Sequence, residues 1–432
     1  MDRQVINIAL LGVGTVGGGV YKVLRQNSKE IEMKVGARLE VVKVLERDLE
    51  RARILGIPEN IVTTNFAGIT GDPDIDIVVE LVGGVEAALS FVKGALEAGK
   101  SVVTANKDLI AQDGQELFQV AREKNVDLLF EASVGGGIPI IRPLKDSLAA
   151  NKIQQIIGIV NGTTNYMLTK MAREGSDFAD VLAEAQAKGY AEADPTSDVE
   201  GLDAARKLAI LASIGFNSRV TFKDVYVEGI TRITQQDIIC AKELGYVVKL
   251  LAIAKESDGS IEARVHPAFL PTAHPLASVN DVFNGIFVRG DAVGDTMFHG
   301  RGAGEMPTAS AVTGDIMEAA RNILYRHRGR NGCTCYDRKP IKPIADIRSK
   351  YYVRLIVLDK PGLSDSIAGV FNNREVSLSS QIRKRKSGEL AELIFVTHEV
   401  LERDIQDALT VIKDMPAVDG IANLIRVEGD GC

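Results

Sequence analysis

The sequence predicts an α/β protein built from a doubly wound, Rossmann-type nucleotide domain, a mixed α+β domain and a C-terminal ferredoxin-like unit. The chain has 432 residues, more than one compact core of ordinary size accommodates. Short β-branched runs alternate with helical patterns up to about residue 130, the order of successive βαβ units around a parallel sheet. From residue 352 the order becomes strand, helix, strand, strand, helix, strand, which is the split βαββαβ arrangement.

The first domain is expected to cover residues 1–130. A helix predicted at 85–98 ends at Gly99, a residue suited to the left-handed conformation that follows many helices. The strands of this domain are predicted at 5–11, 39–45, 75–82, 101–104 and 126–130.

The second domain is expected to cover residues 131–324 and to bind substrate, carry out catalysis and mediate dimerisation. It begins with a Gly-rich turn, a helix at 138–150 and a strand at 153–160, and helical stretches follow through residue 216. A helix near 305–324 is expected to pack back on the first domain. Residues 325–349, where apolar periodicity fades, are predicted to be a linker.

The third unit is expected to cover residues 350–432. Its strands are predicted at 352–358, 376–382, 390–396 and 420–427, and its helices at 363–371 and 401–415.

Composition excludes several classes of partner. A net charge of −7 creates no field that attracts nucleic acid or an anionic membrane. The first four residues lead directly into an apolar strand without the basic and apolar regions of an export signal. The cysteines are too sparse for a disulfide framework, and they are Cys240, Cys333, Cys335 and Cys432. We therefore expect a cytoplasmic protein.

A glycine loop follows the first strand and opens a helix, which is the context of a dinucleotide-binding site. Its residues are Gly12, Val13, Gly14, Thr15, Val16 and Gly17. The three glycines would permit a tight turn, close approach of the pyrophosphate and close packing of helix on strand. The alternative is a glycine-rich turn without a ligand, which this context disfavours.

The end of the second strand carries signals for both nicotinamide dinucleotides. Glu46 could bond the ribose 2′-hydroxyl of NAD and repel a phosphate, whereas Arg47 could pair with the 2′-phosphate of NADP. We favour NADP slightly, with Arg47 as a cofactor-binding residue and NAD as the alternative.

Residues 185–207 are unusually rich in carboxylates for a segment flanked by apolar helix. Asp203 and Lys207 are four apart on a predicted helix, so they can pair on one face. Taken alone, this pattern is more typical of a solvated ion pair on a helix surface.

The same segment resembles the signature of homoserine dehydrogenases. The matching residues are Ala185, Gly189, Asp194, Pro195, Asp198, Gly201, Asp203 and Lys207. Segments 104–107, 131–139, 161–166 and 302–312 resemble the same family, in order along the chain. The terminal unit, with Asp359, Lys360, Pro361 and Gly362, resembles an ACT domain, a module that typically binds a small amino acid.

The resemblance implies reversible NAD(P)H-dependent reduction of L-aspartate 4-semialdehyde to L-homoserine in threonine and methionine biosynthesis. It also implies feedback inhibition by threonine through the ACT domain, and a homodimer or homotetramer. Two alternatives remain. A phosphorylating semialdehyde dehydrogenase would need a nucleophilic cysteine, for which Cys240 is the only core candidate. A sensor without catalytic activity would bind the dinucleotide and turn over no aldehyde.

The resemblance also assigns roles to individual residues. Lys207 is the expected proton donor to the developing alkoxide, held by Asp203. Lys107 would lie between cofactor and substrate at the carboxyl edge of the sheet. Glu192 is expected to bind the substrate's α-ammonium group. Asp198 is a weaker substrate-binding candidate, and a helix-capping role is at least as consistent with its position.

A monovalent cation such as sodium is expected at the Gly-rich turn after residue 130. The resemblance implies that Glu131 and the carbonyl groups of Val134, Gly136 and Ile138 are its ligands, an all-oxygen set suited to a hard cation. The ion would be structural. The alternative is a tight turn whose polar groups bind water.

Other conspicuous residues are assigned no function. Cys333 and Cys335, near His327, have the wrong spacing for zinc and are interpreted as free surface thiols. The basic run at 383–386 is interpreted as a solvated hairpin tip, and the five histidines show no catalytic pattern.

Overall fold

The computed structural model describes residues 5–329, 332–385 and 389–429. Three features of the sequence lie outside these residues: the first four residues, Lys386 at the end of the basic run, and Cys432. Within the described ranges, no helix combines the length and apolar character needed to span a membrane.

The chain forms two compact units, each assembled from three segments. The first comprises residues 1–154, 206–224 and 288–338, and the second comprises residues 155–205, 225–287 and 339–432. The three-domain bounds expected from the sequence stay a prediction.

The first unit contains a parallel sheet of six strands in the order β3-β2-β1-β4-β5-β6. This order starts at the centre and grows outward in both directions, as in other doubly wound folds. The strands are β1 (Val5–Leu11), β2 (Arg38–Leu45), β3 (Val62–Thr63), β4 (Ile77–Glu80), β5 (Ser101–Thr104) and β6 (Leu128–Leu129). Strand β3 was not predicted, because two residues show no periodicity.

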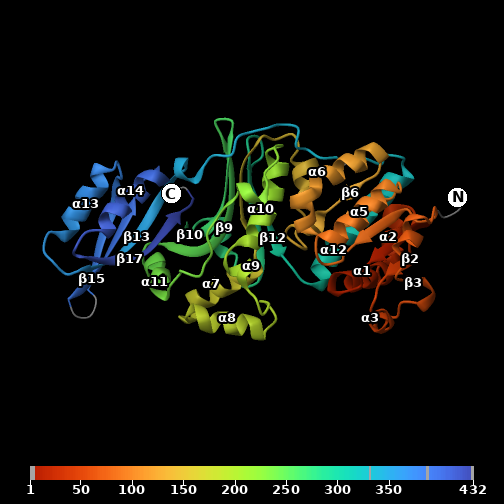
Figure 1. The fold of residues 1–432 in the computed structure, drawn as a ribbon, viewed down its shortest axis with the longest axis horizontal. Helices are drawn as coiled ribbons and strands as arrows, with labels where there is room; N and C mark the ends of the chain where they lie inside the picture. Colours follow the sequence, from red (N-terminus) through yellow and green to blue (C-terminus); the bar gives the residue numbers. More distant parts are fainter. Residues whose placement is uncertain (1–4, 330–331, 386–388, 430–432) are drawn as a thin grey trace. The chain divides into compact units, whose positions relative to one another are not determined.

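Helices cover this sheet, and they are α1 (Thr15–Gln26), α2 (Ser28–Val35), α3 (Leu49–Ile54), α4 (Phe66–Thr70), α5 (Glu86–Glu97), α6 (Lys107–Lys124) and α12 (Glu305–Leu324). Helix α12 packs against α1 although it lies far along the chain (Figure 1). A Cβ atom added at Gly19 would lie 3.0 Å from the Cβ of Ala309, so only glycine allows this approach. Apolar residues of α12, including Val312 and Ile316, belong to the core of the sheet.

The helix expected at 138–150 is shorter and wider in the structure. Residues Pro143–Ser147 form a π-helix, and turn residues follow it. Pro143 lacks an N–H group, so it cannot donate an ordinary helical hydrogen bond. The prediction of a helix is confirmed in part, because helical residues are present from 141 to 147 but they end earlier than expected and the last five form a π-helix.

The second unit is built on a mixed sheet. Within this unit the strand order is β7-β9-β10-β17-β13-β15-β14, and β8 and β16 pair with β10 and β13. The strands are β7 (Ile153–Ile159), β8 (Tyr226–Val227), β9 (Tyr246–Ser257), β10 (Ser260–Pro271), β13 (Arg348–Leu358), β14 (Leu378–Arg385), β15 (Leu390–Thr397), β16 (Val400–Leu401) and β17 (Val418–Val427). The chain between β10 and α12 carries β11 (Phe283–Gly290) and β12 (Gly294–Arg301).

The helices that the sequence predicted between residues 160 and 216 form four separate pieces. They are α7 (Gly162–Glu174), α8 (Phe178–Ala187), α9 (Thr196–Val199) and α10 (Leu202–Gly215), and α11 (Gln235–Glu243) follows. Helix α10 begins in the second unit and ends in the first.

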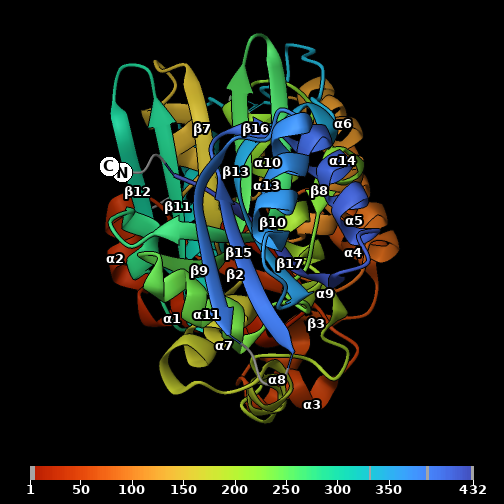
Figure 2. The same ribbon diagram turned by 90° about the vertical axis from the view of Figure 1, so that its left-hand side faces the viewer.

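The C-terminal segment has the predicted order of main elements, with the short strand β16 added. Helices α13 (Leu363–Asn373) and α14 (Glu402–Lys413) lie next to each other (Figure 2). They contribute Ile367, Phe371 and Ile405 to one core with alternate residues of β13 and β15. Both helices therefore cover the same face of the sheet.

Strand β17 belongs to two parts of this sheet. It pairs with β13 over most of its length, and Arg426 and Val427 also pair with Ala268 and Phe269 of β10. A fully buried arginine on β10, Arg264, forms an ion pair with Glu428, just after β17. The C-terminal segment and the central strands of the second unit are thus one continuous structure.

Candidate active site

The glycine loop has the geometry that the sequence predicted. Gly12 has φ +89°, a left-handed conformation that favours glycine. A Cβ atom at Gly17 would lie 2.1 Å from the carbonyl oxygen of Gly12, so any larger residue would push helix α1 away from the strand. Gly14 is the N-cap of α1 and supplies no side chain to bond its first N–H groups. These groups are therefore oriented to bind an anion such as a pyrophosphate.

Glu46, at the end of β2, is bonded to the backbone of the loop. Its carboxylate accepts the N–H groups of Val13 at 3.0 Å, Arg47 at 2.8 Å and Asp48 at 3.0 Å. Burial raises the pKa of Glu46, but these N–H donors and nearby Arg51 lower it, and the net pKa lies below the ordinary value. The side chain is therefore an anchored carboxylate at neutral pH.

Two arginines lie beside this carboxylate. Arg47 is exposed, as a residue that meets a cofactor phosphate would be. Arg51 places a guanidinium nitrogen 3.9 Å from the position of a Cβ atom on Gly14, next to the glycine loop. A role for Arg51 was not predicted, because a helix position four residues after Arg47 carries no motif.

The carboxyl ends of β4 and β5 are joined by a buried network around Glu80. Thr104 donates its hydroxyl to Glu80 at 2.6 Å, and Val82 donates its N–H at 2.7 Å. Asn106 bonds the carbonyl oxygen of Gly84 at 2.8 Å and caps helix α6. Burial raises the pKa of Glu80 to about 6, and its two hydrogen bonds only partly oppose this effect. The network fixes the start of α6, where Lys107 is the first residue.

Lys207 lies on α10 within the first unit, and the neighbouring residue connects its helix to that of Lys107. Arg206 forms an ion pair with Asp108, with 2.9 Å between Nε and Oδ1. Asp108 follows Lys107 in the first turn of α6. The helical turns that carry the two predicted lysines are therefore adjacent, and both lysines are half-buried.

In the second unit, Asn161 brings together two of the predicted carboxylates. Its amide nitrogen lies 2.7 Å from Asp198 and 2.9 Å from Asp203, and its oxygen accepts the N–H of Thr164 at the start of α7. Asp203 is buried, with an exposed fraction of 7%. Asn161 belongs to the matching segment 161–166, but no role was predicted for it. An asparagine followed by Gly-Thr-Thr is typical of a helix cap, and this pattern does not predict that its amide nitrogen also bonds two carboxylates.

Asp198 and Glu192 lie in different environments. Asp198 lies within the single turn α9, and its carboxylate is bonded by Asn161. The nearby Asp194 instead bonds the N–H and hydroxyl of Thr196 at the start of that turn. Glu192 is exposed on the loop between α8 and α9. Its carboxylate is thus accessible to a small cation.

Glu131 binds backbone groups with both of its carboxylate oxygens. They accept the N–H groups of Ile140 at 2.6 Å, Ile141 at 2.7 Å and Arg142 at 2.8 Å. The backbone N–H of Glu131 donates to Asp315, whose pKa is raised to about 7 mainly by burial. The Glu131 carboxylate therefore anchors the chain at residues 140–142.

The structure also bears on a side-chain metal site and on the nucleophilic cysteine. Among the described residues, no group of three or more His, Cys, Asp or Glu side chains is arranged to hold a metal ion. Cys240 is 1% exposed on α11, so its thiol is unsuited to attack a substrate. This burial disfavours the phosphorylating alternative.

Comparison with known proteins gives consistent matches over nearly the whole chain. A family model described as the NAD binding domain of homoserine dehydrogenase matches residues 12–131, and one described as homoserine dehydrogenase matches residues 139–317. The homoserine dehydrogenase of Bacillus subtilis (strain 168) is 44% identical over 430 residues, covering 99% of each chain.

Solved structures give the same result. A homoserine dehydrogenase from Thiobacillus denitrificans superposes with a TM-score of 0.93 at 42% identity and covers 99% of both chains. A hyperthermophilic archaeal homoserine dehydrogenase in complex with NADPH superposes with a TM-score of 0.62 at 29% identity. That match covers 73% of this chain and 98% of the archaeal chain.

Proposed function

This chain belongs to the homoserine dehydrogenase family and is an NAD(P)-dependent oxidoreductase, and we propose that it reversibly reduces L-aspartate 4-semialdehyde to L-homoserine. The observation that carries the proposal is the ion pair between Asp108 and Arg206, which makes the turns of Lys107 and Lys207 adjacent. This reaction serves threonine and methionine biosynthesis, and we assign the enzyme to the cytoplasm.

The two lysines act on the aldehyde. The bound nicotinamide supplies the hydride, so negative charge develops on the aldehyde oxygen and must be stabilised. Lys207 donates its Nζ proton to that oxygen, and in the reverse direction it accepts the hydroxyl proton. Lys107 lies between cofactor and substrate at the carboxyl edge of the sheet. Asp203, one helical turn before Lys207, holds the ammonium group in place.

The amino-acid end of the substrate is bound by carboxylates. Glu192 is exposed and binds the α-ammonium group as a charge-assisted pair. Asp198 supports substrate binding from α9, where Asn161 fixes its orientation. Asn161 is thus a positioning residue, because it also bonds Asp203 and reaches the substrate only through these carboxylates.

For the cofactor we propose NADP, with NAD as a weaker alternative. Gly12, Gly14 and Gly17 admit the pyrophosphate. Glu46 is committed to three backbone N–H groups, which leaves the guanidinium groups of Arg47 and Arg51 to meet a 2′-phosphate.

We propose that a monovalent cation such as sodium stabilises the turn after Glu131. The carbonyl groups of Val134, Gly136 and Ile138 lie in irregular backbone, and Gly136 has a positive φ of +53°. Oxygen ligands of this kind suit a hard cation. Oε1 of Glu131 accepts two N–H groups and Oε2 accepts one, so Oε2 keeps the capacity for one further contact and Glu131 would contribute that oxygen beside the carbonyl groups. The ion would be structural.

We further propose that the C-terminal segment is an ACT domain through which threonine inhibits the enzyme. Its strand order β17-β13-β15-β14 and its two helices on one face support a ferredoxin-like module. The loop at Asp359–Gly362 ends with Gly362 at φ +75°, at the start of α13. Because such modules commonly self-associate, we expect a homodimer or homotetramer.

The test of the catalytic proposal is oxidation of NADPH after addition of aspartate semialdehyde. Wild-type protein should turn over, and Lys207→Ala should lose at least about a hundredfold in kcat, the usual contribution of a positioned proton donor. Lys223→Ala, which removes an exposed lysine from the same unit, is the matched control. The assignment fails if wild-type protein is inactive or if Lys207→Ala keeps full activity.

A further inference from the structure

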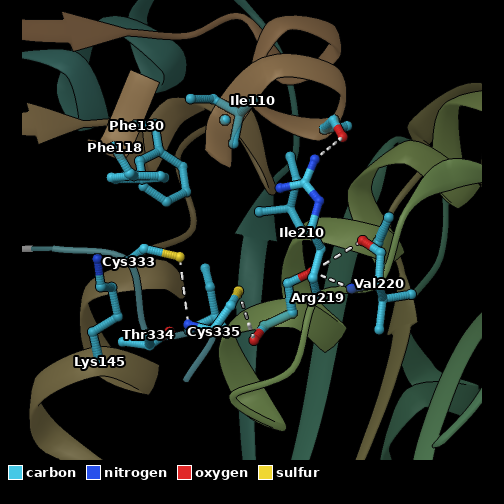
Figure 3. Close-up of a pocket in the computed structure, with 15 residues that line it drawn as sticks. Ile110, Phe118, Phe130, Lys145, Ile210, Arg219, Val220, Cys333, Thr334 and Cys335 are labelled. Carbon is cyan, nitrogen blue, oxygen red and sulfur yellow. Dashed lines mark hydrogen bonds between the residues drawn. The ribbon is translucent and has the colours of Figure 1, made fainter. Parts of the chain in front are cut away.

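A cavity of about 40 Å³ lies in the first unit between α6, α10 and the segment 333–335. Ile110 and Phe118 line it from α6, and Ile210 lines it from α10 (Figure 3). Cys333 and Cys335 form another part of its wall. The two thiols, which were predicted to be free surface thiols, therefore border a cavity between two helices.

The two thiols are close to each other and differ in exposure. The N–H of Cys335 donates to the sulfur of Cys333 at 3.4 Å. Cys333 is exposed, whereas Cys335 is half-buried and its sulfur lies 3.8 Å from the carbonyl oxygen of Ser213 on α10. The Cys333 thiol is thus accessible to a reagent from solvent, and the Cys335 thiol lies beside it.

Two cations lie in the wall of the same cavity and influence the exposed thiol. Lys145 donates to the carbonyl oxygen of Gly332 at 2.9 Å and lies against the rings of Phe118 and Phe130. Arg219 bonds the carbonyl oxygen of Gln112 on α6 at 3.1 Å. Burial lowers the pKa of Lys145, an effect that Cys333, Asp146, Asp315 and Cys335 oppose.

These surroundings make Cys333 a thiolate near neutral pH. The largest influence on the pKa of Cys333 is a hydrogen bond from the thiol of Cys335, which lowers it. Burial raises this pKa, whereas the Cys335 N–H, Lys145 and Arg219 lower it further. Together they lower the pKa of Cys333 to about 6. The pKa of Cys335 is raised by its hydrogen bond to Cys333 and by burial, so it remains a thiol.

We propose that Cys333 and Cys335 form an oxidation site that reacts with hydroperoxides and closes to a disulfide. The Cys333 thiolate attacks one oxygen of hydrogen peroxide and breaks the O–O bond. The departing hydroxide takes up a proton and leaves as water, so Cys333 becomes a sulfenic acid. The Cys335 sulfur then attacks the Cys333 sulfur, and the displaced hydroxide and the thiol proton leave as a second water. Two thiols are oxidised, and one peroxide is reduced to two waters.

The position of this pair couples its oxidation to the active site. The step that follows rests on the proposed roles of Lys107 and Lys207. Closing an S–S bond brings the sulfurs to about 2.05 Å and removes the thiol contacts with the Ser213 carbonyl group and the Cys335 N–H. The contact with Ser213 involves α10, and Lys145 contacts α6 through Phe118. Oxidation therefore shifts the two helices that carry the lysines, and turnover falls.

The chemical test uses the full chain carrying Cys432→Ser, so that only three thiols remain. Treatment with hydrogen peroxide should remove two hydrogen atoms from the peptide that contains Cys333 and Cys335, and dithiothreitol should restore them. Alkylation of Cys333 should have its midpoint near pH 6, against about 8.5 for a synthetic peptide of residues 332–337. Lys145→Met should raise the midpoint, while buried Cys240 is the internal control and should stay unmodified.

Two results overturn the oxidation site: both thiols remaining reduced in peroxide, or protein and peptide showing the same alkylation midpoint. In Cys335→Ser, peroxide should leave a sulfenic acid at Cys333 that dimedone traps, and its absence would contradict the order of steps.

NADPH oxidation is then measured before and after peroxide, with Cys333→Ser as the insensitive control. Disulfide formation with unchanged kcat overturns the coupling to activity. Because mass and alkylation require no turnover, failure of the proposed enzyme function is recognised separately.

Discussion

Arg264 of β10 and Glu428, which follows β17, form an ion pair that is closed to solvent. Arg264 is 0% exposed and Glu428 is 3% exposed. Glu262 also bonds Arg264 at 2.7 Å, and Lys255 pairs with Glu428 at 3.1 Å. Burial, the largest influence, raises the pKa of Glu428, but Arg264 and Lys255 outweigh it and hold that pKa far below its ordinary value. The pair fastens the C-terminal segment to the central strands of the second unit.

Glu428→Gln should destabilise the protein, because it removes one of the two carboxylates that pair with the buried guanidinium of Arg264. We expect the free energy of unfolding to fall by about 3 kcal/mol, as is usual when one partner of a buried pair is removed. Denaturation in urea at pH 7 measures this loss. Glu399→Gln removes an exposed carboxylate and should change stability little. If the two substitutions lower the free energy of unfolding equally, the buried ion pair does not stabilise the protein more than an exposed carboxylate does.

Glu80→Gln should change how stability depends on pH. The pKa of Glu80 is about 6 in the folded protein and 4.5 is its ordinary value, so the native state favours the protonated form. The protonated carboxyl therefore contributes to the stability of the folded protein, and this contribution is fully present below pH 4.5 and is lost as pH rises through 6. Glu80→Gln removes this contribution. The free energy of unfolding of the variant minus that of wild type should therefore be about 2 kcal/mol higher at pH 7 than at pH 4.5. Parallel stability curves from urea denaturation would contradict this prediction.

Asn161→Ala should impair catalysis by freeing the carboxylates of Asp198 and Asp203. We expect kcat/KM to fall by at least about tenfold, since small displacements of positioned groups have large effects on rate. Asn161→Asp should be worse, because it adds a third negative charge beside two others. Binding of NADPH, followed by its fluorescence, should stay unchanged in both variants. A loss confined to cofactor binding would place the role of Asn161 elsewhere.

Arg47→Ala should affect NADPH and spare NADH. Losing a charge-assisted contact with the 2′-phosphate should raise the KM for NADPH about tenfold, which corresponds to about 1.4 kcal/mol. Arg53→Ala is the matched control, since Arg53 is exposed and pairs with Glu50 and Glu59. If the KM values for NADPH and NADH rise together, Arg47 does not read the phosphate.

The sequence predicted the nucleotide-binding fold well because its signals are local. Strands at 5–11 and 101–104 match β1 and β5 residue for residue, and the loop from Gly12 to Gly17 lies where expected. Features that depend on distant contacts were not predictable. The pairing of β17 with β10, the ion pair between Arg206 and Asp108 and the position of Arg51 join residues that no spacing rule relates.

Site residues show the same limit. Asp203 could be singled out from its spacing to Lys207, but its bond with Asn161 links positions 42 residues apart in the chain. Glu131 was selected for its oxygen atoms, and only the fold reveals that backbone N–H groups already use its carboxylate. Cys333 and Cys335 lacked a recognisable pattern because their cationic neighbours come from other segments.

The two-sided pairing of β17 has a consequence during translation. The ribosome produces Glu428 164 residues after Arg264. Until then Ala268 and Phe269 of β10 lack their partners on β17 and Arg264 has only Glu262 as a charge partner, and unpaired strand edges invite aggregation. The second unit therefore completes its folding late in synthesis, and chains that stall before residue 426 are substrates for chaperones and proteases.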